Sequence, residues 1–132
     1  MLSMLTWTRD SEEGSELVEF ALILVPLSLF IFGIIEMGAL AMTYSSLVNV
    51  AREGARAGIV TTADTGTVEA AAQAAAFGLD GGQLTITVAW PNSAQVRVTA
   101  RYDYQPITGQ IIPIAGADGV LPLQAVATMR RE

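Results

Sequence analysis

The chain has 132 residues, of which 52% are hydrophobic, and its formal net charge is −6. It contains no cysteine, no histidine and no lysine. These absences exclude a disulfide framework, a thiolate or imidazole zinc site and a Ser-His-Asp triad. The acidic balance argues against nucleic acid as the main partner. We therefore expect no metal and no cofactor, and one domain besides an anchor.

The first residues form a short charged leader, which we assign to residues 1–14. Arg9 is its only base, and it lacks the basic start and small-residue cleavage site of a secretory signal peptide. Its acids, Asp10, Glu12 and Glu13, suit the positive N-terminal end of a following helix. Ser11 is a candidate cap for that helix.

A single long helix is expected over residues 14–58. Residues 17–35 are apolar on every side of it, apart from Glu19. At 1.5 Å per residue, about 45 helical residues span roughly 65–70 Å, whereas the hydrocarbon core of a bilayer is about 30 Å thick. We therefore expect residues 15–43 to be the transmembrane or filament-core part, with Glu36 near one interface, and residues 44–132 to form the domain outside it.

The second half of the predicted helix has two faces. Ser45, Asn49, Arg52 and Arg56 form the polar stripe. The opposite stripe repeats at three- and four-residue intervals and is weakly apolar, which is typical of a helix that covers a sheet. Its residues are Leu40, Tyr44, Leu47, Ala51, Gly54 and Gly58.

Two residues of the apolar segment need a physical explanation. Pro26 removes the helical hydrogen bond to the carbonyl of Leu22, so we expect a kink or a locally unwound segment between them. A carboxylate at Glu19 costs about 2.5–3.5 kcal/mol inside a membrane on insertion scales. No basic residue lies near it along the helix. Its partner must come from elsewhere, unless Glu19 lies hydrated at the membrane boundary.

The remainder predicts one short helix and three strands. The alanine-rich residues 67–79 favour a helix, with Glu69 in its first turn and Gly78 as its stop. Turns are expected at residues 80–82 and 91–94. Three alternating runs place one apolar set on a single face of an antiparallel meander. These sets are Leu84, Ile86, Val88 and Trp90; Val96, Val98, Ala100, Tyr102 and Tyr104; and Leu121, Leu123, Ala125, Ala127 and Met129.

The predicted fold class is therefore α+β and pilin-like. The outer half of the long helix would cover the sheet. We interpret the arginines of the last two strands and the C-terminus as a solvated sheet face, namely Arg97, Arg101, Arg130 and Arg131. The loop before the third strand carries Ile107, Ile111, Ile112 and Ile114, which form either a docking patch or a segment folded under the sheet.

An enzymatic function is disfavoured. The acids Asp64, Asp80, Asp103 and Asp118 occur singly in turn-rich segments, where Asp bonds to nearby backbone. Their spacing does not resemble an EF-hand loop. Neither histidine nor cysteine is present for general-base or nucleophilic work.

Several strings resemble known families. Residues 14–20 (GSELVEF) resemble the prepilin-peptidase site of type IV pilin-like proteins, in which the peptidase cuts after the glycine and the fifth mature residue is a glutamate. The same residues, with residues 32–38 (FGIIEMG), 51–56 (AREGAR) and 127–130 (ATMR), resemble TadE-like proteins of the Tad (Flp) pilus. The resemblance is specific over residues 12–58. The acidic leader departs from the basic leader usual in prepilins, and the positive-inside count does not choose an orientation.

The resemblance implies cleavage between Gly14 and Ser15, which would create an amine on Ser15. It implies that Glu19, followed by Phe20, pairs with that amine of an adjacent subunit as the helices pack into a filament core. The implied location is a single pass through the cytoplasmic or inner membrane, with the C-terminal domain outside the cytoplasm and on the cell surface after assembly. The implied partners are further copies or other pilins, and the Tad assembly machinery.

Two functions follow as hypotheses. The first is a structural subunit, a pilin or minor pilin, of a Tad-type pilus. The alternative is a single-span accessory subunit that docks in a larger membrane or envelope complex, for which an uncleaved leader beginning at Met1 would be expected.

Overall fold

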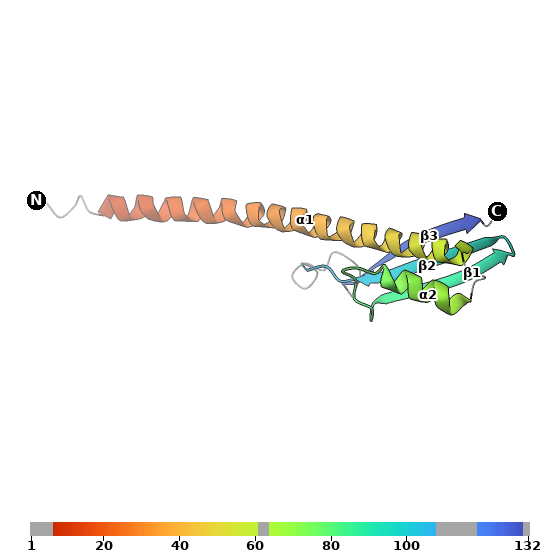
Figure 1. Ribbon diagram of the computed structural model, residues 1–132. Helices are drawn as coiled ribbons and strands as arrows, with labels where there is room; N and C mark the ends of the chain where they lie inside the picture. Colours follow the sequence, from red (N-terminus) through yellow and green to blue (C-terminus); the bar gives the residue numbers. More distant parts are fainter. Residues whose placement is uncertain (1–6, 61–63, 108–118, 131–132) are drawn as a thin grey trace, which may run out of the picture. The chain divides into compact units, whose positions relative to one another are not determined.

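The computed structural model describes residues 7–60, 64–107 and 119–130, with side chains from residue 14 onward (Figure 1). These residues form two helices and a three-stranded antiparallel sheet, so the predicted α+β class is confirmed. The elements are α1 (Trp7–Val60), α2 (Thr65–Ala74), β1 (Leu84–Asn92), β2 (Gln95–Tyr104) and β3 (Leu121–Arg130).

By its internal contacts the chain divides into two compact units, Met1–Ile35 and Glu36–Glu132. The described part of the first unit is helical throughout and belongs to α1. The second unit contains the last 25 residues of α1, from Glu36 to Val60, together with α2 and the sheet.

Helix α1 begins earlier than the sequence suggested. Its described part starts at Trp7, so Ser11 lies inside the helix and the expectation that Ser11 caps it was wrong. A cap needs non-helical backbone angles, whereas residues 7–13 contain neither proline nor glycine and continue the helix. The helix also passes through Pro26 without the unwound segment that the sequence allowed. A kink at Pro26 stays a prediction.

Helix α2 is shorter than expected and lies earlier in the chain. It follows Asp64, which occupies the N-cap position with extended backbone, so Glu69 lies beyond the first turn. It ends at Ala74, before Gly78, because the chain must turn back toward β1. Successive tight backbone bonds, from Phe77 N to Ala75 O (2.9 Å) and from Leu79 N to Ala76 O (3.4 Å), make that reversal. Tertiary geometry here overrides the helix propensity of alanine.

The sheet is the predicted meander, in the order β1-β2-β3. The turn that leads into β1 is closed by Asp80, whose Oδ1 accepts a 2.9 Å hydrogen bond from the Gly82 amide. In the register of β2 and β3, Ala100 lies opposite Ala125 and Tyr104 lies opposite Leu121. The inward-facing residues of β2 are all buried, as the alternation predicted: Val96, Val98, Ala100, Tyr102 and Tyr104.

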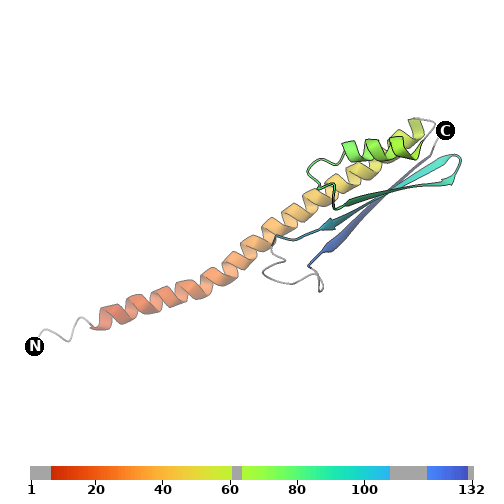
Figure 2. The same cartoon turned by 90° about the horizontal axis from the view of Figure 1, so that it is seen from below.

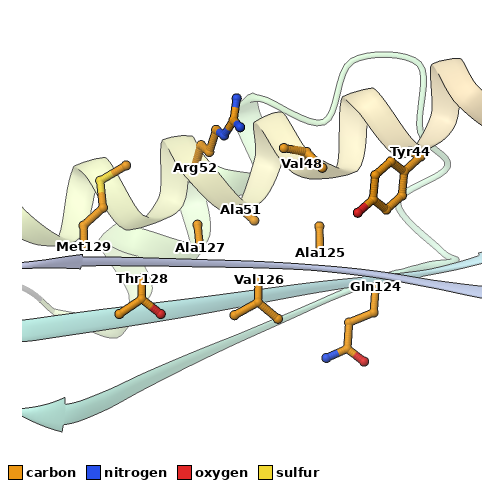
Figure 3. Close-up of a pocket in the computed structure, with 10 residues that line it drawn as sticks. All are labelled: Tyr44, Val48, Ala51, Arg52, Gln124, Ala125, Val126, Ala127, Thr128 and Met129. Atoms are coloured by element: carbon orange, nitrogen blue, oxygen red, sulfur yellow. The ribbon is translucent and has the colours of Figure 1, made fainter.

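Helices α1 and α2 cover the same face of the sheet (Figure 2). The buried stripe of α1 consists of Leu47, Val50, Ala51, Gly54, Ala55 and Gly58. Tyr44 does not belong to it, since it is 49% exposed at the open edge beside β3 (Figure 3). The buried stripe therefore lies slightly further around the helix than predicted. It includes Val50 and Ala55, which the sequence prediction had left out.

Two glycines of the stripe are required by the close approach of helix and sheet. A Cβ added at Gly54 would lie 2.9 Å from Ala72 Cβ and 3.1 Å from Val98 Cγ1. A Cβ added at Gly58 would lie 2.8 Å from Val96 Cγ2. All three distances are shorter than carbon–carbon van der Waals contact, so a larger residue would force the layers apart.

Candidate functional site

The most unusual surface of the first unit is its apolar helix segment, residues 14–35 of α1. Every residue in it is exposed except Ser28, which is partly exposed. Phe20 is 63% exposed, Leu22 71% and Phe30 73%. A helix that is apolar on all sides is stable only inside a membrane or among other helices. Nothing in the described part of the chain covers this segment, and the helix Gly14–Val60 is long and apolar enough to cross a membrane.

The predicted assembly residues lie at the start of this segment. Gly14, Ser15, Glu19 and Phe20 are all helical and exposed. Within the described residues Glu19 makes no ion pair, and its pairing with another subunit stays a prediction. A Cβ added at Gly14 would meet nothing within 4 Å. Glycine weakens a helix by about 1 kcal/mol relative to alanine, so the reason for Gly14 lies outside the packing of the described chain.

The second unit begins at a polar contact between two residues that are distant along the chain. Tyr104, the last residue of β2, donates a 2.5 Å hydrogen bond from its hydroxyl to Oε1 of Glu36. Tyr104 is only 8% exposed, and Glu36 is half-buried. Burial, followed by the hydrogen bond and the negative charge of Glu36, raises the pKa of Tyr104 to about 12.

Part of this contact was visible in the sequence. Glu36 is the first charge after the apolar run. Tyr104 is the last residue of its alternating apolar set, and unlike the last residues of the other two sets it carries a hydroxyl group. What the alternation could not show is that the end of β2 lies beside Glu36, because 68 residues separate the two along the chain.

A shallow groove runs between α1 and the free edge of β3 (Figure 3). Tyr44, Val48 and Ala51 line its helix side, and Arg52 lies at its rim. On its other side the side chains of β3 alternate: Ala125, Ala127 and Met129 point toward α1, and Gln124, Val126 and Thr128 point away from it. The groove contains no arrangement of acid, base or nucleophile, and among the described residues no three potential metal ligands gather.

The predicted docking loop is described only at its first residue. Ile107 is 69% exposed and does not fold under the sheet. Ile111, Ile112 and Ile114 lie outside the described residues. The docking role of this loop stays a prediction.

Comparison with known proteins agrees with the resemblance. Residues 14–56 match the family model of TadE-like proteins, so this part of the chain is TadE-like. The matched segment contains the exposed apolar helix, Glu36 and most of the stripe that covers the sheet. Over these residues the chain is similar to a family of the Tad pilus system, and its apolar helix fits a single membrane span. No curated protein and no solved structure matches the chain.

Proposed function

We propose that this chain, which is TadE-like over residues 14–56, is a structural subunit, a pilin or minor pilin, of a Tad-type pilus. One observation carries the proposal. Residues 14–35 expose apolar side chains around the whole helix, whereas the packed α+β unit begins at Glu36. Such a helix suits lipid before assembly and neighbouring helices after it.

The boundary at Glu36 also supports a definite span. Residues 14–35 would measure roughly 33 Å as a helix, close to the roughly 30 Å hydrocarbon core. Ala39 and Leu40 already pack against the core of the second unit, so they are covered by protein. We therefore propose that the membrane segment ends at Ile35, whereas the sequence predicted an end at Thr43.

Within this function we assign cleavage to the bond between Gly14 and Ser15. The amine that is released on Ser15 would neutralise Glu19 of a neighbouring subunit, which removes the cost of an uncompensated carboxylate in an apolar environment. Phe20 would pack in the same contact. The C-terminal unit would then lie outside the cytoplasm.

Two measurements test the proposal. N-terminal sequencing of protein recovered from assembled pili should begin at Ser15, and electron microscopy of purified material should show filaments that contain this chain. Discrete particles in which an uncleaved chain co-purifies in fixed stoichiometry with unrelated proteins would overturn it. That result would support an accessory subunit of an envelope complex instead.

A further inference from the structure

Two surfaces of the second unit remain uncovered when its core has formed. The first is the outer sheet face, whose exposed side chains alternate with those of the core and include Arg97, Arg101, Asp103, Val126, Thr128 and Arg130. The second is the α2 outer face, made of the exposed residues Glu69, Ala70, Gln73 and Ala74. Because α2 buries Val68 and Ala72 against the inward side of the sheet, the two surfaces lie on opposite sides of the unit (Figure 2).

These surfaces carry opposite charge. The outer sheet face has three arginines, Arg97, Arg101 and Arg130, against one acid, Asp103, which gives a net charge of +2 in a chain of net charge −6. The α2 outer face has one acid, Glu69, and neither lysine nor arginine, for a net charge of −1; with Asp64 and Asp80, which lie before and after the helix, residues 64–83 reach −3. Complementary charges of this size steer two surfaces together and fix their register.

Little of this charge is neutralised within the described residues. Arg101 lies 3.9 Å from Asp103, and both side chains are more than half exposed. Arg97 Nε donates to Thr128 Oγ1 at 3.3 Å, which leaves its charge uncompensated. Within the described chain no ion pair involves Arg130 or Glu69. Among the described residues, Arg97, Arg130 and Glu69 are therefore the charges without an ion-pair partner on these two surfaces.

The shapes of the two surfaces also agree. Ala70 and Ala74 give the α2 outer face little relief, so its backbone can approach a flat sheet closely. Val126, which is 53% exposed, lies near the middle of the outer sheet face, where the register places it opposite Thr99 and between Arg97 and Arg101. Contact between Ala70 and Val126 would bring Glu69 near the two arginines that flank Val126, and of these Arg97 has no carboxylate beside it in the described chain.

We propose that α2 of one copy packs across the outer sheet face of a second copy, with Ala70 against Val126 and Glu69 facing Arg97. The two surfaces differ and lie on opposite sides of the unit, so the contact is heterologous and repeats from copy to copy. A heterologous contact that does not close on itself generates a helical filament. This inference rests on the proposed function and adds the contact through which the globular parts associate.

The absence of cysteine allows a direct test by disulfide crosslinking in the full-length chain in its native membrane. Ala70→Cys combined with Val126→Cys should give a ladder of linked copies on oxidation. Neither substitution alone should give the ladder, nor should the control pair of Ser45→Cys with Val126→Cys, since Ser45 is equally exposed but lies on α1. Absence of the Ala70–Val126 product overturns the contact.

A separate variant tests the proposed function, that is, packing of copies through their apolar helices. Leu22→Cys lies in the exposed apolar segment, and copies that pack through their helices should link there. Linked Leu22→Cys copies without an Ala70–Val126 product leave helix packing intact and refute only this contact. The reverse result supports the contact and refutes packing through the helices.

Charge reversal tests the electrostatic basis of the contact. In the Ala70→Cys/Val126→Cys background, Glu69→Arg or Arg97→Glu should each lower the crosslinked yield several-fold. The two reversals in one chain should restore it, because the pair is re-formed with opposite sign. Both residues are exposed, so neither change disturbs the core. Unchanged yield in both single variants would show a merely solvated face and overturn the proposed pairing.

Discussion

The hydroxyl of Tyr104 donates a 2.5 Å hydrogen bond to the carboxylate of Glu36 and thereby fastens the end of β2 to the residue at which the packed unit begins. On one side of Glu36 along α1, the apolar side chains are exposed. On its other side, Ala39 and Leu40 already pack against the core. This pair therefore marks the change from a helix made for an apolar environment to a helix that covers a sheet.

Removing this hydrogen bond should weaken the second unit. Tyr104→Phe is expected to lower the free energy of unfolding by about 1.5–3 kcal/mol, the usual range for a hydrogen bond to a charged group. Denaturant unfolding of the full chain in detergent, followed by the circular dichroism of the sheet, measures the change. Tyr44→Phe is the control, because Tyr44 is half exposed at the β3 edge. An equal loss in both variants would contradict the assignment.

The same pair predicts an alkaline loss of stability. The pKa of Tyr104 is raised to about 12, first by burial and then by Glu36, above the value of about 10 for an unfolded tyrosine. A raised pKa means that this stabilisation is fully present below pH 10 and is lost as the pH rises from 10 through 12. Tyrosinate absorbance should show a late titration step that Tyr104→Phe removes. A step that persists in that variant would refute the assignment.

The glycines of α1 should respond to substitution according to their contacts. Gly58→Ala places a methyl group 2.8 Å from Val96 Cγ2, so overpacking should destabilise the second unit by about 1–3 kcal/mol. At Gly38 the added Cβ meets nothing within 4 Å, and alanine should stabilise the helix by up to about 1 kcal/mol. Thermal unfolding of both variants gives the comparison. The same sign at both positions would refute the close approach.

Truncating leucines should separate the two parts of α1. Leu47 is fully buried, so Leu47→Ala should cost about 2–5 kcal/mol of unfolding free energy. Leu22 is 71% exposed, so Leu22→Ala should leave the unfolding of the second unit unchanged. It should weaken only membrane insertion or assembly, which fractionation and microscopy would measure. A loss of sheet stability in Leu22→Ala would show that the exposed segment is part of the folded core.

The two acids at the start of the apolar segment should differ in their effect on assembly. Glu19→Ala should abolish filaments yet leave membrane insertion intact, since it removes a charge that costs about 2.5–3.5 kcal/mol in the bilayer. Glu16→Ala is the matched control, because Glu16 is exposed three residues earlier on the same helix. Microscopy and membrane fractionation of both variants test this. Normal filaments from Glu19→Ala would remove the reason for pairing between subunits.

The elements of the fold were readable from the sequence because their signals are local. Alternation in residues 84–90, 96–104 and 121–129 placed every inward-facing strand residue on the correct face, with only Trp90 left exposed where β1 reaches its end. The long apolar run predicted both α1 and its exposed first part. Periods of two and of about 3.6 residues are properties of the chain itself and need no knowledge of distant neighbours.

The first and last residues of the helices were harder to predict from the sequence. Alanine propensity favoured a helix as far as Leu79, but the path to β1 ended α2 at Ala74. The sequence predicted that the charged leader is separate from the helix, but α1 already begins at Trp7, within the leader. The end of a helix depends on the direction that the following segment takes, and tertiary packing determines that direction more than residue preference does.

By itself, then, the sequence determined an apolar rod with one acid in it and a small α+β unit behind it. Only the tertiary structure decided how the sheet-facing stripe of α1 is composed, since Val50 and Ala55 are buried and Tyr44 is not. It alone joined Glu36 to Tyr104 and placed the basic outer sheet face on the side of the unit opposite to Glu69 of α2. These relationships depend on residues that are distant along the chain, and a pattern of neighbouring residues carries no information about them.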